Sequence, residues 1–188
     1  MKTLSLAIAA TIALMAAAVS TLNPDPAAAM PLEDTRISWV ATKHPVLRVT
    51  LSSDLTETGE RLLNLDLVVN GQVKQRLQAV SGKADVQHFR LGQASRANSR
   101  EPLPQGMYTI GQVDRAGGLP QAMGDTFIPL APQFATGRSG LGIHLDADRP
   151  IGPGTIGCLA LLTQADIDTV ARFVSGYNVR TLIVDYGL

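Results

Sequence analysis

The sequence has one cysteine, few aromatic residues and no excess of either charge. Aromatic residues make up 4% of its 188 residues, and the 16 Lys and Arg residues balance the 16 Asp and Glu residues. Balanced charge without a single-sign run excludes the basic footprint of a nucleic-acid-binding domain and a polybasic membrane contact. A single cysteine excludes an internal disulfide, and the chain has no CxxC or His/Cys cluster typical of a metal site.

Residues 1–29 have the pattern of a secretory signal peptide. Lys2 supplies the positive start, an apolar run extends from Leu4 to Val19, and Ala27–Ala29 offers small residues for cleavage. The run of about 16 residues is short for a spanning helix, which needs ~20. An uncleaved membrane anchor is the alternative. Because the chain has no second run of that length, we expect residues 30–188 to form one exported domain without stable membrane insertion.

The stretch 62–80 predicts a β-hairpin. Apolar residues alternate along its first half, which is typical of a half-buried strand, and Asn70-Gly71 marks the turn. In a simple two-residue loop, the apolar face of the first strand would meet charged residues of the second. We therefore predict a bulged three-residue loop, which pairs Leu63 with Leu77, Leu67 with Val73 and Asp66 with Lys74.

Residues 163–176 are the one segment with a clear helical pattern. Thr163 is the expected N-cap, Asp166 lies in the first turn, and Gly176 is expected to end the helix. Several strands and one main helix predict a mainly β, sandwich-like domain. The helix is expected to bury one apolar face, made of Ile167, Val170, Ala171 and Val174. Further strands are expected at 37–41, 46–52, 141–145 and 180–186 and at the end of the stretch 102–110.

Two further segments are expected to be connections. The polar stretch 84–100 includes His88, which is an alternative second catalytic histidine. The stretch 117–138 is rich in Gly and Pro, and connections of that length are often functional. Its apolar residues either line a substrate groove or pin the loop to the core; they are Met123, Phe127, Ile128 and Phe134.

The segments 142–146 and 153–159 hold the residue types of a nucleophilic site. Cys158 follows His144 by fourteen positions. A thiol needs a base to become a nucleophile near neutral pH, and histidine is the commonest base. Gly157 allows close backbone approach, so that N–H groups can point at a carbonyl oxygen that gains charge. The alternative is that the lone cysteine is a small buried apolar residue.

His144 followed by Thr155-Ile156-Gly157-Cys158 resembles the signature of the L,D-transpeptidase (YkuD-like) catalytic domains. That signature is a histidine, a loop of a dozen or so residues, and Ser/Thr-x-Gly-Cys. The Asn-Gly hairpin and the Pro104–Tyr108 segment also occur in the order of the family. The resemblance implies that Cys158 is the nucleophile, that His144 is its base, that Thr155 fills the Ser/Thr position, and that the Gly157 and Cys158 amides form the oxyanion site.

Two further residues are candidates for substrate binding. Arg138 lies where many members of the family have a basic or polar residue before the histidine strand. Asp146, together with Asp148, follows that strand. These carboxylates either orient His144, contact a substrate amine, or lie in a solvated turn.

The resemblance implies acyl transfer on peptidoglycan stem peptides through a thioester, which forms cross-links without a cofactor. We expect a monomer in the periplasm or cell wall. With water as acceptor, the same site would make an L,D-carboxypeptidase or a wall hydrolase. Many members have His where this chain has Ile156, and Arg or Asn where it has Ala160. These departures favour a further alternative, an inactive peptidoglycan-binding module.

Overall fold

The computed structural model describes residues 44–188, so the predicted signal peptide and the strand predicted at 37–41 lie outside the described residues. No helix in the described part has both the length and the apolar character needed to cross a membrane. Three short 3-10 helices, η1 (Ala84–Val86), η2 (Gly92–Ala94) and η3 (Gln121–Met123), lie in the connections. The main elements are β1 (Val46–Leu55), β2 (Arg61–Val69), β3 (Gln72–Ser81), β4 (Gly106–Ile110), β5 (Ile128–Pro132), β6 (Gly142–Leu145), β7 (Leu159–Leu161), α1 (Gln164–Gly176) and β8 (Thr181–Val184).

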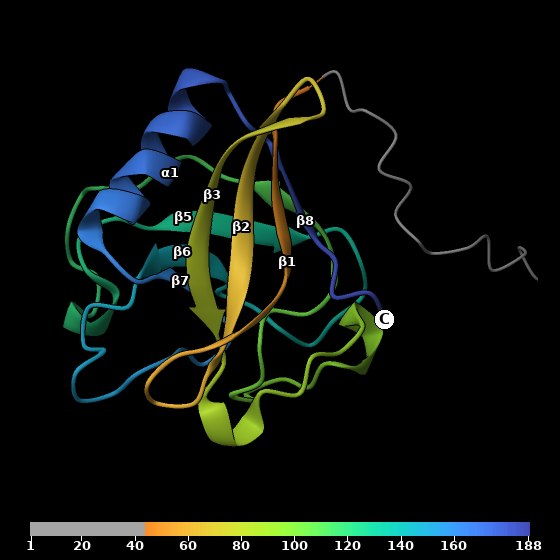
Figure 1. The fold of residues 1–188 in the computed structure, drawn as a ribbon, viewed down its shortest axis with the longest axis vertical. Helices are drawn as coiled ribbons and strands as arrows, with labels where there is room; N and C mark the ends of the chain where they lie inside the picture. The colour runs from red at the N-terminus through yellow and green to blue at the C-terminus, as the bar shows by residue number, and fades with distance from the viewer. Residues whose placement is uncertain (1–43) are drawn as a thin grey trace, which may run out of the picture. The chain divides into compact units, whose positions relative to one another are not determined.

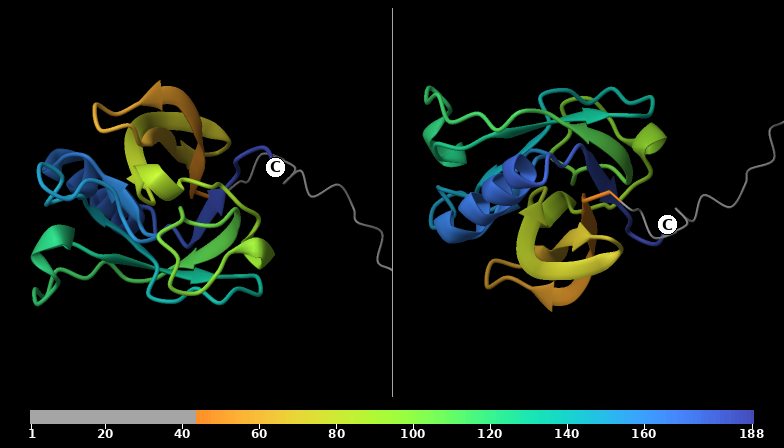
Figure 2. Two further views of the ribbon diagram at one scale, coloured as in Figure 1. Left: turned by 90° about the horizontal axis from the view of Figure 1, so that it is seen from below. Right: turned by 90° about the horizontal axis from the view of Figure 1, so that it is seen from above.

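The strands close into one barrel in the order β1-β2-β3-β7-β6-β5-β4-β8 (Figure 1). Two neighbouring pairs are parallel, β6 with β7 and β8 with β1, and the others are antiparallel. Figure 2 shows the same fold from below and from above the view of Figure 1. The predicted mainly β class with one main helix is confirmed. The sandwich-like arrangement is not confirmed, because β8 pairs with both β1 and β4 and so joins the two ends of the sheet.

The predicted three-residue loop of the hairpin is wrong. Val69 pairs with Gln72, and both Asn70 (φ 52°) and Gly71 (φ 74°) are left-handed, as a two-residue type I′ turn requires. A bulge then shifts the register between Leu67 and Val68. This shift pairs apolar with apolar and acidic with basic side chains, which is what the predicted three-residue loop was meant to achieve. It places Leu65 opposite Leu77 and Asp66 opposite Arg76.

The connection 117–138 contains a strand that the sequence analysis did not predict. Within it, β5 pairs with β4 on one side and with β6 on the other. Its residues, Ile128–Pro132, include two prolines, which weaken any strand pattern. The strands predicted at 46–52, 141–145 and 180–186 are all present, and the stretch 102–110 leads into β4 as expected.

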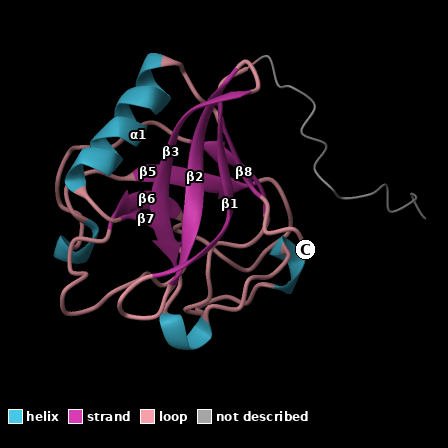
Figure 3. Ribbon diagram, viewed as in Figure 1, coloured by secondary structure: helices cyan, strands magenta, loops and turns pink. Residues whose placement is uncertain are grey.

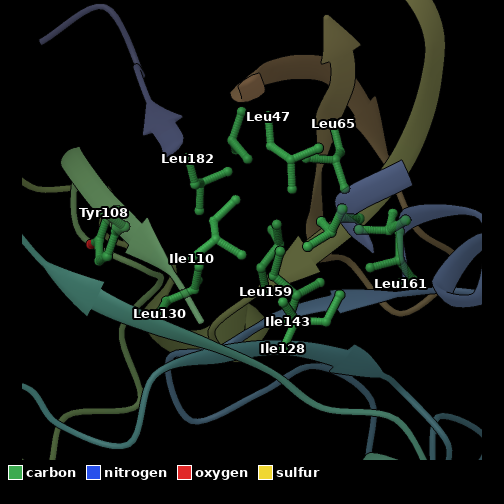
Figure 4. Packing of buried hydrophobic residues seen from close by; sticks show 14 of the residues in the cluster. Leu47, Leu65, Tyr108, Ile110, Ile128, Leu130, Ile143, Leu159, Leu161 and Leu182 are labelled. Atoms are coloured by element: carbon green, nitrogen blue, oxygen red, sulfur yellow. The ribbon is translucent and has the colours of Figure 1, made fainter. Parts of the chain in front are cut away.

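The barrel interior is the hydrophobic core, and the buried face of α1, which contacts β6 and β7 (Figure 3), belongs to the same cluster. Thr163 caps the helix by accepting a hydrogen bond from the Asp166 amide, as predicted. The helix ends at Gly176, although the left-handed residue beyond it is Asn178 (φ 51°). The predicted helical face is buried together with Phe173. Core side chains from the strands meet in Figure 4, among them Leu47, Leu65, Tyr108, Ile110, Ile128, Leu130, Ile143, Leu159, Leu161 and Leu182.

Candidate active site

His144 and Cys158 lie on neighbouring parallel segments and line one cavity of about 560 Å³. In the ladder between β6 and β7, His144 is the partner of Ala160. Cys158 precedes Ala160 by two residues, so strand alternation directs its side chain to the same face as that of His144. Ile143 and Leu159 face the barrel core instead. The closed barrel therefore brings a thiol and an imidazole to one external cavity.

The hydrogen bond of His144 defines which ring nitrogen is basic. Nδ1 lies 2.7 Å from the carbonyl oxygen of Leu145, which can only accept, so Nδ1 carries the proton. Nε2 then holds the free lone pair. His144 is 6% exposed, and its ring is stacked on Phe127 with centroids 6.4 Å apart. Burial lowers the pKa of His144, against the opposing effects of the Leu145 bond and of the Asp146 and Asp148 charges. The imidazole is therefore a neutral base at pH 7.

The thiol of Cys158 is 7% exposed and lines the same cavity. Its Sγ donates to the Gly140 carbonyl oxygen at 3.7 Å. Burial raises the pKa of Cys158, while a backbone hydrogen bond from Gly142 and the charge of Arg138 act in the opposite direction. The resting pair is thus thiol and imidazole, and the proton moves only when an electrophile is bound.

Thr155 and Gly157 shape the turn before the cysteine. The Thr155 Oγ1 atom donates to the Cys158 carbonyl oxygen at 2.7 Å. It accepts from the Gly82 amide at 3.0 Å and from the Gly157 amide at 3.1 Å. Both lone pairs and the proton of this hydroxyl are therefore used within the protein. Because the Gly157 N–H is committed to Thr155, the Cys158 N–H is the remaining one of the two predicted oxyanion donors.

Arg138 lines the cavity, but its guanidinium is bound within the protein. Nη1 donates to Ser95 Oγ and to Ser99 Oγ, each at 3.0 Å. Nη2 donates to the carbonyl oxygens of Ile156 at 3.0 Å and Glu101 at 3.3 Å. Burial lowers the pKa of Arg138. These contacts make Arg138 a support of the turn that precedes Cys158.

Asp146 is 4% exposed, so it does not lie in a solvated turn. Its Oδ2 accepts from the Gly154 amide at 3.1 Å and from Arg149 at 3.0 Å. Arg149 in turn lies 3.8 Å from Glu60. The carboxylate of Asp146 therefore fixes the loop between β6 and β7. Asp148 is half-buried and also lines the cavity.

The other predicted residues have different locations. Of the four groove candidates, Met123 lines the cavity, while Phe127 stacks on His144. Ile128 is buried in the barrel, and Phe134 packs edge-on against Tyr108. His88 is exposed and lies outside the cavity lining.

The two positions that depart from the family pattern have different environments. Ile156 is 71% exposed at the cavity rim. Ala160 is fully buried with Leu62 and Val80 in a small apolar cluster outside the barrel. A substrate can therefore contact the side chain at 156, whereas the side chain at 160 is covered by the protein.

The sequence analysis did not identify Ser81 and Lys83, which both contact the loop that carries Cys158. Ser81 Oγ donates to the Cys158 carbonyl oxygen at 2.7 Å. Lys83 donates to three carbonyl oxygens of that loop. No local pattern predicts contacts between residues some seventy positions apart.

Comparison with known proteins adds no family assignment. No family model matches the chain, and no curated protein matches its sequence. Within residues 44–188, no three His, Cys, Asp or Glu side chains are grouped so that they could hold a metal ion. The functional argument therefore depends on the geometry of the cavity and on the sequence motif.

Proposed function

We propose that this protein is a cysteine-dependent L,D-transpeptidase that acts on peptidoglycan stem peptides. The observation that carries the proposal is the shared cavity of Cys158 and His144, in which the Nδ1–H bond to Leu145 leaves Nε2 free as a base. The His144 and Thr-x-Gly-Cys158 motif supports this class of cysteine enzyme over others. The proposal includes a leader at 1–29, action in the periplasm or cell wall, and a barrel that is a form of the sandwich-like L,D-transpeptidase domain.

In the acylation step, Cys158 Sγ attacks the carbonyl carbon of the third stem residue. His144 Nε2 takes the thiol proton, and the developing oxyanion accepts a hydrogen bond from the Cys158 N–H. The bond to the terminal D-alanine nitrogen breaks, and His144 returns the proton to that amine. A thioester remains on Cys158.

In the second step, the amine of another stem attacks the thioester carbonyl. His144 takes a proton from this amine, the C–S bond breaks, and the thiolate of Cys158 recovers the proton. The products are a cross-linked dimer and the free enzyme. With water as the nucleophile, the same sequence gives a tripeptide.

One carboxylate in the cavity lining supports an amine, rather than water, as the acceptor. Lys83 and Arg138 are bound to protein oxygens, and Arg100 pairs with Asp85 at 2.6 Å. Asp146 is bound to Arg149 and Gly154. Among the described charged residues that line the cavity, Asp148 is the one whose carboxylate has no hydrogen-bond or ion-pair partner in the protein. The Asp148 carboxylate can therefore accept a hydrogen bond from the amine of an acceptor stem.

The test is to incubate the exported protein with disaccharide-tetrapeptide and to identify the products by mass. We expect dimers from the wild type and unchanged substrate from Cys158→Ala and His144→Gln. Tripeptides alone would indicate an L,D-carboxypeptidase, and loss of cross-links from purified sacculi would indicate a wall hydrolase. A second measurement is a carbapenem adduct that depends on Cys158. Unchanged substrate and no adduct, with retained muropeptide affinity, would contradict the proposal and favour a binding module.

A further inference from the structure

Lys83 lies two residues after the end of β3 and contacts three consecutive carbonyl groups of the loop that leads to Cys158. Its Nζ donates to the carbonyl oxygens of Gly152 at 2.8 Å, Pro153 at 2.7 Å and Gly154 at 3.0 Å. An ammonium group has three N–H donors, so these bonds use all of them. The side chain is half-buried.

The two residues before Lys83 hold the next part of the same loop. The Gly82 carbonyl oxygen accepts from the Thr155 amide at 3.1 Å, and the Gly82 amide donates to Thr155 Oγ1 at 3.0 Å. Ser81 Oγ bonds the Cys158 carbonyl oxygen and accepts from the Leu103 amide at 2.7 Å. The segment 81–83 therefore follows the catalytic loop from residue 152 to residue 158.

Close packing leaves little room for this loop to move. Gly154 has φ +77°, and a Cβ atom there would lie 2.4 Å from the Gly82 carbonyl oxygen. Three carbonyl groups that converge on one point have partial negative charges that repel one another, and a cation between them reverses this effect. Without the ammonium group, these carbonyl oxygens would lose a charge-assisted donor, and the loop would relax.

We infer that Lys83 is a positioning residue, which fixes residues 152–154 and thereby directs the Cys158 thiol toward His144. Lys83 also lines the cavity, and a lysine in such a place is the obvious candidate to bind a substrate carboxylate. Its saturated hydrogen bonds argue against that role. The inference deepens the proposed function, and the catalytic role of Lys83 rests on that function. The placement of the loop by Lys83 does not depend on it.

The experiment compares Lys83→Met with Lys74→Met, which removes the same charge from an exposed site on β3. We expect Lys83→Met to lower kcat for tetrapeptide about 100-fold, because small misplacements of reacting groups have effects of this size, while KM changes less than about threefold. We expect the rate of Cys158 alkylation by iodoacetamide to rise in Lys83→Met, since a relaxed loop exposes the buried thiol. Lys74→Met should match the wild type in all three quantities, and thermal unfolding should show that both variants are folded.

Several outcomes would overturn the inference. A wild-type kcat in folded Lys83→Met contradicts it, and a raised KM with unchanged kcat means that Lys83 binds substrate. If the wild type turns over no stem peptide, the proposed function fails, yet the alkylation rates still decide whether Lys83 holds the loop. If Lys83→Met does not fold, Lys83→Gln keeps an amide donor, and we expect intermediate values of kcat and of the alkylation rate. Wild-type values in that variant would also contradict the inference.

Discussion

The Nη2 atom of Arg138 lies 1.6 Å from the position that a Cβ atom on Gly157 would occupy. The guanidinium reaches this position because Nη2 bonds the Ile156 carbonyl oxygen at 3.0 Å, directly beside the glycine. Gly157 also has φ +128°, which L side chains rarely adopt. The residue before Cys158 is therefore a glycine for two independent reasons, a conformational one and a steric one.

We expect Gly157→Ala to destabilise the protein by about 3 kcal/mol and to abolish turnover, because Arg138 must leave the turn. Gly118→Ala is the matched control, since Gly118 has φ +82° but open space around its Cβ position. That control should lose about 1 kcal/mol through backbone strain alone. Urea unfolding measures both values. Equal losses in the two variants would show that the contact with Arg138 has no energetic importance.

The pH dependence of Cys158 alkylation should reveal a neutral pair. Burial raises the pKa of the thiol and lowers that of His144, so thiolate forms only in alkaline solution. We expect the rate with iodoacetamide to keep rising beyond the ordinary thiol value of ~8.5. Turnover should persist in acid below the ordinary histidine value of ~6.5, because protonation of His144 is disfavoured. A fast alkylation rate that is constant from pH 5 upward would instead indicate a thiolate–imidazolium ion pair.

Asp148→Asn should change the ratio of dimers to tripeptides more than the total amount of product. Loss of the unpaired carboxylate removes the attraction for a cationic amine, so the thioester is hydrolysed more often. We expect the ratio of dimers to tripeptides to fall about fivefold. Glu57→Gln, which neutralises an exposed carboxylate outside the cavity, is the control. Mass analysis of the products gives the ratio, and an unchanged ratio would rule out Asp148 as the site of acceptor recognition.

Asp66 makes a pH-dependent contribution to stability on the outside of the barrel. Burial alone would raise its pKa, but the hydrogen bonds and charges of Arg76 and Arg48 outweigh burial and hold the pKa below its ordinary value. A depressed folded-state pKa stabilises the protein above the unfolded value of ~3.9, and this effect is lost as the pH falls through the folded value. We expect Asp66→Asn to cost about 2 kcal/mol at pH 7 and progressively less below pH ~4.

Urea unfolding at several pH values checks this expectation for Asp66. Asp125→Asn, at an exposed carboxylate, is the control and should cost little at any pH. A loss in Asp66→Asn that stays constant from pH 7 to pH 2 would show that the side-chain shape, and not its charge, is what matters.

The predictions from sequence were correct where the signal is local. The cap of Thr163, the apolar face of α1 and most strands follow from residue spacing alone. The turn at Asn70-Gly71 was predicted, but the bulge lies between Leu67 and Val68 and not in the loop, because cross-strand pairing can be satisfied by an insertion at either place. The closure of the barrel depends on β8 pairing with β1 and β4, and short strands with no alternation signal do not encode such distant partners.

The candidate site was likewise predicted from the sequence only in part. The types of residue and their spacing identified Cys158 and His144, and both line the cavity. The supporting roles of Thr155, Arg138 and Asp146 were not predicted, because these side chains bind backbone groups of the loop and not a ligand. Such contacts depend on where the chain returns in space, and composition carries no information about that.

The place of β8 in the barrel has a consequence for how the polypeptide folds during its translation. This strand is the last of the described strands in sequence order, and it lies between β1, which is the first of them to be made, and β4. A nascent polypeptide that has reached residue 180 still has two free sheet edges and an interior open to solvent. Folding of the whole barrel must therefore wait until translation of residues 181–184 is complete, and any chaperone that protects the growing chain has to remain bound until then.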